Sequence, residues 1–150
     1  MTADQLLHEL GLAMGLPGLR FDASRCARLM FDGKTALNFE HDAAAGCIHL
    51  YGTLAPLPAA GREALFRQLL EANLFGAQTG GATLAVDAAH HEVVLCRSVP
   101  LEDGTGAAFA AVVERFVAAL EEWSSRLAGA APAAVPVSPP AGGFGAFLRG

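Results

Sequence analysis

The sequence predicts an α+β fold in the order α-β-β-β-α-β-β-α, with helices packed on a twisted antiparallel sheet. Apolar residues recur at helical spacing near both ends and in the middle of the chain, and strand-like runs fill the segments between them. A glycine-rich corner at residues 76–81 joins the middle helix to an apolar strand. One face of the predicted sheet is apolar and the other is mixed, which is typical of an antiparallel meander covered by helices on one side.

The first helix is expected over residues 3–15. Its apolar side chains recur at helical spacing at Leu6, Leu7, Leu10 and Met14. Gly15 and the Pro17-Gly18 pair end it, since glycine and proline interrupt helices. Leu12 and Leu16 lie off this stripe, so the core does not claim them.

Three strands are expected next, over residues 25–31, 34–41 and 46–54. Asp32-Gly33 stands between two apolar runs and predicts a tight hairpin turn. In the third strand the apolar side chains share one face, namely Ile48, Leu50 and Leu54. The opposite face carries a mixed set, namely Cys47, His49, Tyr51 and Thr53.

The second half of the chain repeats the alternation of helix and strand. A helix is expected over 60–74, strands over 82–87 and 91–99, and a long helix over 105–128. The sequence thus predicts one domain over residues 1–128. Residues 129–150 contain mainly Ala, Pro and Gly with a single charge, Arg149, and are predicted to be a disordered tail.

The amino-acid composition excludes several classes of function. Hydrophobic residues make up 53% and charged residues 17% of the chain, against about 25% charged in a typical soluble domain. No stretch reaches the roughly 20 apolar residues of a membrane span, so the surplus apolar surface is expected to be buried against another chain. The net charge of -5 argues against nucleic acid as a partner. The first residues lack the features of a signal peptide, which predicts a cytoplasmic protein.

Candidate chemical sites are weak. Cys26, Cys47 and Cys96 lack CxxC spacing and are expected to be reduced thiols. A metal held by Cys47, His49 and Cys96 requires adjacent strands, and buried thiols beside a solvated histidine explain the pattern more simply. The glycine corner lacks the lysine of a phosphate-binding loop. The sequence therefore predicts no enzyme, no catalytic residues, no metal and no cofactor.

Several strings, in the right order over residues 3–128, resemble the class I type III secretion chaperones of the CesT/Tir chaperone family. They are Leu6-Leu7 to Leu10-Gly11, Met14-Gly15-Leu16, Leu29-Met30-Phe31-Asp32-Gly33, Tyr51-Gly52-Thr53-Leu54, Asn73-Leu74-Phe75-Gly76, Thr79-Gly80-Gly81-Ala82, Val93-Val94-Leu95 and the Phe116 to Trp123 helix. The helix-to-strand joint at 73–84 is the most specific of these.

The resemblance implies a cytoplasmic bacterial homodimer that serves virulence. Such a chaperone binds the N-terminal region of a secreted effector in extended form and keeps it competent for secretion. It uses no ATP itself, and the secretion ATPase is a further expected partner. An exposed strand edge with neighbouring apolar pockets offers a physical basis for binding an extended segment.

The resemblance also implies two sets of site residues. The dimer interface would use the second helix and the following strand, namely Leu65, Leu69, Leu74, Phe75, Leu84 and Val86. Filling of the core of the protomer explains about half of them equally well. Effector contact would fall on Leu12, Leu16, Leu19, Phe21, Arg28 and Asn38. Packing of residues 16–21 between helix and sheet is an equal alternative for that segment.

Two other functions stay open at this point. One is a small-ligand-binding or enzymatic α+β domain that uses the Cys47, His49 and Tyr51 face of the sheet. The other is a dimeric structural or regulatory protein without a secreted client.

Overall fold

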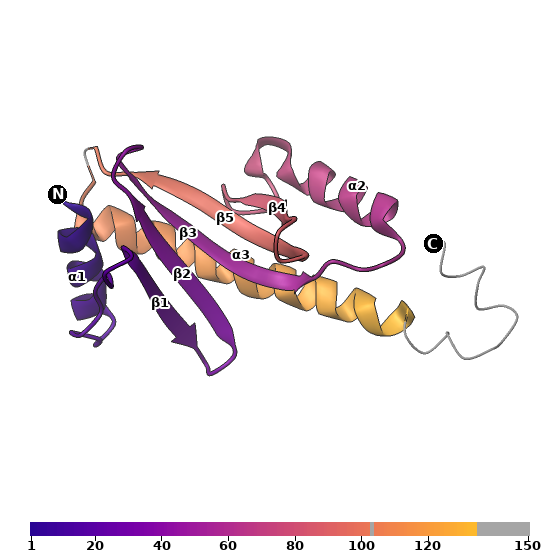
Figure 1. Ribbon diagram of the computed structural model, residues 1–150, viewed down its shortest axis with the longest axis horizontal. Coiled ribbons are helices and arrows are strands. Elements are labelled where there is room, and N and C mark those ends of the chain that lie inside the picture. Colours follow the sequence, from indigo (N-terminus) through magenta and orange to yellow (C-terminus); the bar gives the residue numbers. More distant parts are fainter. Residues whose placement is uncertain (103, 135–150) are drawn as a thin grey trace, which may run out of the picture. The chain divides into compact units, whose positions relative to one another are not determined.

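The computed structural model describes residues 1–102 and 104–134, and its elements follow the predicted order (Figure 1). They are α1 (Ala3–Ala13), β1 (Cys26–Phe31), β2 (Thr35–Asp42), β3 (Cys47–Pro56), α2 (Arg62–Asn73), the 3₁₀ turn η1 (Leu74–Gly76), β4 (Thr83–Asp87), β5 (Glu92–Pro100) and α3 (Gly106–Ala134). The predicted α+β fold is confirmed.

The last helix differs from its predicted bounds. α3 continues to Ala134, through six residues that composition assigned to the tail. Pro132 lies in its last turn, where its missing N–H removes only the bond to the Ala128 carbonyl. The rest of the predicted tail, 135–150, lies outside the described residues.

The five strands form one sheet in the order β1-β2-β3-β5-β4, with β1 and β4 at its edges. β1 pairs antiparallel with β2, and β2 with β3. Asp32 and Gly33 both have positive φ, 52° and 71°, as the primed hairpin turns require. The Asp-Gly signal in the sequence therefore marks the first hairpin correctly.

The chain forms two compact units, the first made of residues 1–52 and 96–118 and the second of residues 53–95 together with α3 from Ala119 onward. The first unit has a core drawn from α1, the first three strands and the start of α3. Its most deeply buried side chains include Leu6, Leu7, Leu37, Phe39, Ile48, Leu50, Phe109 and Phe116. The rings of Phe39 and Phe109 lie 6.4 Å apart in a tilted arrangement, and aromatic pairs of this kind add to the stabilisation from burial.

The second unit takes its core mainly from α3 and from two strands. Leu120, Trp123, Leu84, Val93 and Leu95 are all buried. α2 contributes much less, because only Leu69 and Ala72 of its twelve residues are buried. Trp123 also donates from its indole Nε1 to the carbonyl of Gln78 at 2.9 Å, which ties α3 to the glycine corner.

The joint between α2 and β4 is held by the side chain of Asn73. Its Nδ2 donates to the Leu84 carbonyl at 2.9 Å, and its Oδ1 accepts from the Leu84 N–H at 2.7 Å. One amide side chain thus satisfies both backbone groups of a residue on an edge strand, as a neighbouring strand would. Thr79 is buried in the same corner and donates from Oγ1 to the Ala82 carbonyl at 2.6 Å.

Glycine is required within this corner. Gly76 has φ +66°, and a Cβ placed there would lie 3.0 Å from the Cα of Gly81. Real Cβ atoms rarely approach backbone this closely, and the left-handed conformation adds strain for any other residue. The corner therefore depends on local backbone geometry, which explains its specific sequence.

Asn73→Ala should destabilise the protein by about 1–3 kcal/mol, because both backbone groups of Leu84 lose their partner. Gln68→Ala is the matched control, since Gln68 is an exposed amide on the same helix. Chemical unfolding in urea measures the difference. Equal stability of the two variants would show that water replaces the Asn73 amide without cost.

Candidate functional site

The way in which α1 ends leaves two leucines, Leu12 and Leu16, exposed. The N–H of Leu16 donates to the Gly11 carbonyl and the N–H of Gly15 to the Leu12 carbonyl. These two bonds define a Schellman motif, with Gly15 in the left-handed conformation at φ +72°. Leu12 and Leu16 are left 56% and 43% exposed. The prediction that both lie outside the core is confirmed.

Gly11 makes this helix end possible. A Cβ at Gly11 would lie 2.5 Å from the Leu16 carbonyl oxygen and 3.0 Å from the Cβ of Leu19. Neither neighbour can retreat without breaking the motif, because one is backbone and the other carries a half-buried side chain. The two leucines are therefore presented on a fixed backbone.

Arg25 anchors α1 to the strands. Its guanidinium donates to both carboxylate oxygens of Asp4, at 3.0 and 2.8 Å, and to Nδ1 of His41. It also stacks 4.8 Å above the ring of Phe21. The hydrogen bonds from Arg25 hold the pKa of the Asp4 carboxyl below its usual value.

Phe21 belongs to this cluster and not to the exposed surface. It is only 8% exposed and its ring lies 5.9 Å from that of His41. Phe21 is therefore not exposed, and its burial agrees with the alternative that residues 16–21 pack between helix and sheet. The turn after Pro17-Gly18 carries Phe21 inward, where it packs beneath the Arg25 guanidinium. Leu19 is half-buried.

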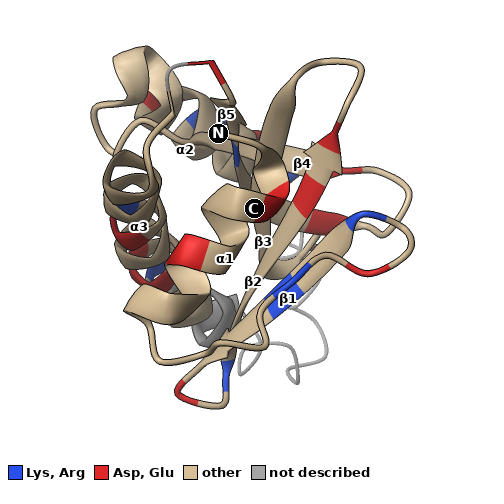
Figure 2. Ribbon diagram, turned by 90° about the vertical axis from the view of Figure 1, so that its left-hand side faces the viewer, with Lys and Arg blue, Asp and Glu red and all other residues tan. Residues whose placement is uncertain are grey.

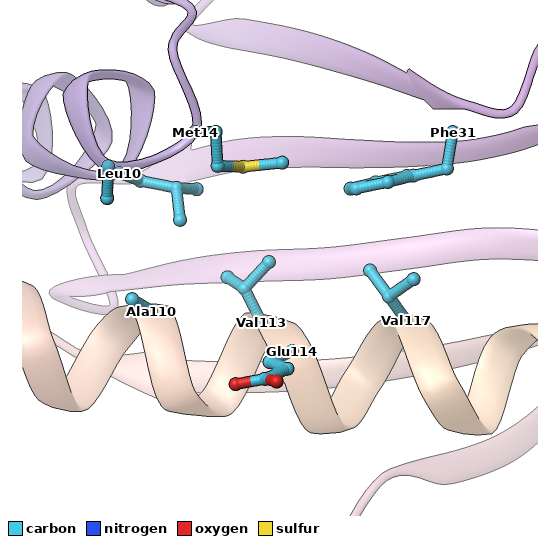
Figure 3. Close-up of a pocket in the computed structure, with 8 residues that line it drawn as sticks. Leu10, Met14, Phe31, Ala110, Val113, Glu114 and Val117 are labelled. Atoms are coloured by element: carbon cyan, nitrogen blue, oxygen red, sulfur yellow. The ribbon is translucent and has the colours of Figure 1, made fainter.

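An apolar groove lies within the first unit (Figure 3). α1 supplies Leu10 and Ala13, its C-cap supplies Met14, and β1 supplies Phe31. α3 supplies Ala110, Val113, Glu114 and Val117. The groove has a volume of about 290 Å³. Glu114 is its only charged side chain, and no ion pair among the described residues involves it. Glu114 is exposed, and its carboxylate points away from Met14 and Phe31 (Figure 3). The groove can therefore accept two or three apolar side chains.

A second concavity lies beside the exposed leucines and is more polar. It is lined by residues 15–20 together with Arg28 and Leu29. Arg28 lies on β1 and pairs across the sheet with Asn38, which in turn pairs with Tyr51. Figure 2 shows basic residues on β1 in blue. Asn38 donates to the Tyr51 carbonyl at 3.3 Å. Burial raises the pKa of the Tyr51 phenol, which keeps it neutral. Arg28, Asn38 and Tyr51 therefore present one guanidinium and two neutral hydrogen-bonding groups.

The second unit carries a separate apolar surface, the α2–β4 patch, made of Leu70, Leu74, Phe75 and Val86. Leu70 is 70% and Phe75 96% exposed, and Phe75 sits in the left-handed region at φ 56°. Large apolar side chains exposed to this degree on adjoining elements mark an interaction surface.

Three residues of the predicted dimer interface lie on this patch: Leu74, Phe75 and Val86. Leu65 is half-buried. Leu69 is 3% exposed, and Leu84 is also buried, so both fill the core of the protomer. Their burial agrees with the alternative that about half of the set fills the core of the protomer. Leu70, adjacent in sequence to Leu69, was not predicted.

The Cys47 face of the sheet gathers polar groups without the features of a reactive site. His49 lies 2.8 Å from Ser98 Oγ through Nδ1, while its Nε2 lies 3.5 Å from Asp42 and 3.6 Å from Cys47 Sγ. Burial raises the pKa of the Cys47 thiol, which is the opposite of nucleophile activation. Neither concavity described above contains these residues.

A metal site finds no support in the part of the chain that the structure covers. Within residues 1–102 and 104–134 no cluster of three or more His, Cys, Asp or Glu side chains could hold an ion. Burial raises the pKa of the Cys96 thiol as well, which disfavours the thiolate that a metal would need. In the same residues no helix has the length and apolar character needed to cross a bilayer.

Comparison with known proteins places the fold. The model of the Tir chaperone protein (CesT) family matches residues 5–124. A search of curated proteins finds no match. Among solved structures, the ExsC–ExsE complex aligns with a TM-score of 0.69 and 23% identity, over 83% of this chain and 96% of the other.

Two further solved complexes have the same fold. The Yersinia pestis type III secretion chaperone SycH, in complex with a fragment of YscM2, aligns with a TM-score of 0.64 and 17% identity, over 81% of this chain and 99% of the other. The ExoU–SpcU complex of Pseudomonas aeruginosa aligns with a TM-score of 0.59 and 23% identity, over 84% and 94%. The α+β fold and the family match agree: the chain belongs to the Tir chaperone (CesT) family.

Sequence reasoning missed most of the groove. The pattern places Val113 and Val117 only in the apolar stripe of the last helix, and Phe31 only at the end of a strand. A usable signal existed, because Ala110, Val113 and Val117 recur three and four residues apart and widen the stripe beyond Phe109 and Phe116.

Asp4→Asn should lower stability at pH 7, because Arg25 loses its carboxylate partner. The pKa of Asp4 is depressed by folding, so its contribution is present above the unfolded pKa of about 3.9. It is lost as the pH falls through the lower folded pKa. The melting temperatures of the variant and of the unaltered chain should therefore differ at pH 7 and become equal at acid pH. Asp32→Asn, in an exposed turn, is the control, and a difference that persists in acid would contradict the ion-pair account.

Proposed function

We propose that the chain is a bacterial cytoplasmic type III secretion chaperone that binds the N-terminal region of a secreted effector in extended form. The observation that carries this proposal is the pair of exposed leucines at the rigid end of α1, beside an apolar groove. The family match and the solved chaperone–effector complexes of the same fold support it.

An extended client suits the chemistry of this surface. β1 is an edge strand, so one side of its backbone is available for hydrogen bonds with an added strand. Phe31, at the end of β1, also lines the groove. A client strand along β1 would place alternate side chains in the groove, while Leu12 and Leu16 contact the segment that follows. Arg28 and Asn38 would bind polar groups of the client on the outer face.

Leu12→Asp and Leu16→Asp should weaken client binding at least tenfold, because each puts a carboxylate into a desolvated apolar contact. Copurification from a secretion-competent strain identifies the client, and calorimetry with its N-terminal fragment then gives the affinity. A negative heat-capacity change is expected, since apolar surface is buried. Cys47→Ala and His49→Ala are the controls.

The same variants separate this proposal from a ligand-binding or enzymatic domain. If Cys47 and His49 prove essential while Leu12 and Leu16 do not, the mixed face of the sheet is the functional site. A metal or metabolite in place of a polypeptide after copurification would lead to the same conclusion.

We further propose that the chain is a homodimer joined through the α2–β4 patch. The patch combines three large side chains of the α2 end, Leu70, Leu74 and Phe75, with Val86 of β4. Burial of an exposed leucine or phenylalanine contributes about 1.5–3 kcal/mol. Obligate interfaces of this apolar kind usually bury roughly 2,000 Å² or more, so neighbouring residues such as Leu65 would join the contact. The secretion ATPase is the expected later partner of the loaded dimer.

Leu70→Asp should give a folded monomer, whereas Leu69→Asp should unfold the protomer. The two residues are adjacent on one helix, but only Leu69 lies in the core, at 3% exposure. Sedimentation gives the mass, and circular dichroism gives the helix content. A stable monomer for the unaltered chain at micromolar concentration would refute the dimer.

A further inference from the structure

We propose that Asp22 sets the register in which an extended client segment pairs with β1. It closes the outer edge of that strand at Cys26 and leaves Arg28 and Met30 as the open positions. This inference rests on the proposed function and deepens it, because it names the stretch of backbone that the client uses and the side-chain pattern that the client needs.

Two hydrogen bonds show which residues of β1 face the edge of the sheet (Figure 1). At the end of the strand, the Phe31 carbonyl accepts from the N–H of Lys34 at 3.1 Å and so faces the β2 side of the hairpin. At the start of the strand, the Cys26 carbonyl accepts from the N–H of Asp22, which precedes β1, and so faces away from β2. Backbone groups of successive residues in an antiparallel strand face opposite sides. The backbone groups of Cys26, Arg28 and Met30 therefore face the open edge.

Asp22 occupies both edge groups of Cys26. Its N–H donates to the Cys26 carbonyl at 2.8 Å, and its Oδ1 accepts from the Cys26 N–H at 3.0 Å. The same carboxylate oxygen accepts from the N–H of Ser24 at 2.8 Å, which fixes the loop before β1. A client strand would have to displace Asp22 before it could pair with Cys26.

The open stretch is short. At its far end Asp32 has φ 52°, so the chain leaves the extended conformation directly after Phe31. Outside the ladder with β2, no hydrogen bond within residues 1–102 and 104–134 uses the backbone of Arg28 or Met30. Both residues are exposed. The edge thus offers a client two N–H donors and two carbonyl acceptors.

Space for an added strand lies beside this stretch. The more polar concavity, between residues 15–20 and the pair Arg28 and Leu29, has a volume of about 410 Å³. Paired strands lie about 4.8 Å apart, so a client strand that pairs with Arg28 would pass through this concavity. The Schellman bonds hold its other wall, at Gly15 and Leu16, in place.

The two faces of β1 define the side chains that a client needs. Leu29 is buried, and Phe31 points into the apolar groove, toward Met14 (Figure 3). Arg28 and Met30 are exposed on the opposite face. Side chains of an added strand alternate in the same way. The edge therefore selects a segment with two apolar residues, which face the groove, separated by one residue that faces water.

Amide hydrogen exchange of the full chain tests the open stretch. The probe is the tightest binder selected on the chain from a displayed library of random peptides, made synthetically. Its binding should slow exchange of the Arg28 and Met30 amides at least tenfold, because both gain a backbone partner. The Cys26 amide should exchange slowly with and without the peptide, since Asp22 already holds it. The peptide should contain two apolar residues one residue apart, and Asp at either position should weaken binding at least tenfold.

Substitution of Asp22 tests the register. Asp22→Ala removes the acceptor of the Cys26 N–H, so the Cys26 amide should exchange at least tenfold faster in the free chain and should become slowed by the peptide. Asp22→Asn keeps an oxygen acceptor and should behave as the unaltered chain does. Ser24→Ala, in the same loop, is the matched control and should leave the Cys26 amide unchanged. If the peptide still slows only Arg28 and Met30 in Asp22→Ala, Asp22 does not set the register.

Three other results would overturn the proposal. They are a selection that yields no binder, a binder that leaves the Arg28 and Met30 amides unprotected, and protection of these amides without peptide that increases with protein concentration. The last result would show that a second copy of the chain occupies the edge.

Failure of this inference can be told apart from failure of the proposed function. If Leu12→Asp and Leu16→Asp weaken client binding while the peptide leaves the edge of β1 unprotected, the chain is a chaperone that does not use this edge. If the peptide protects the edge and the leucine variants bind the client as the unaltered chain does, the proposed function alone is contradicted.

Discussion

α3 supplies buried side chains to the cores of both units, and this limits how many core positions α2 fills. Phe109, Val113 and Phe116 enter the core of the first unit, and Leu120, Trp123 and Leu127 enter that of the second. One helix therefore supplies both cores, and α2 is left with two buried residues. Leu70 of α2 and Leu74 and Phe75 of η1 stay exposed. An interaction surface follows from the way the chain distributes its hydrophobic residues.

α1 is firmly anchored and yet carries exposed leucines at its C-terminal end. Its inner face is buried through Leu6, Leu7 and Leu10, and Arg25 ties its first turn to the strands through Asp4. Its C-terminal turn is fixed by the Schellman bonds around Gly11 and Gly15. Exposed leucines on so constrained a backbone lose little conformational freedom on binding, which lowers the cost of association.

The fold could be predicted because its signals are local. Helical spacing, the Asp32-Gly33 turn and the glycine corner each specify an element from a few neighbouring residues. The site was harder, because periodicity indicates which residues share a face but not how deeply the face is buried. Leu69 is buried and its neighbour Leu70 is exposed, and only the packing of β4 on α2 determines which of the two is buried.

Other features depend on contacts between distant parts of the sequence. Phe21 is buried because Arg25, in a left-handed conformation, stacks above its ring. No propensity predicts that conformation for arginine. The groove likewise combines residues of α1, β1 and α3 that lie some 100 positions apart in the sequence. The end of α3 at Ala134 was missed for a simpler reason, since composition alone suggested a tail.

The Asn73 amide has a consequence for the behaviour of the protein at high concentration. β4 is an edge strand, and unpaired edges invite strands of other molecules to add on and begin fibrils. Asn73 already occupies both backbone groups of Leu84, the second residue of a strand of only five. An intruding strand would have to displace this amide before it could align. A chain that exposes apolar side chains to recognise partners is thus protected from templated self-assembly where its backbone would otherwise be most open to it.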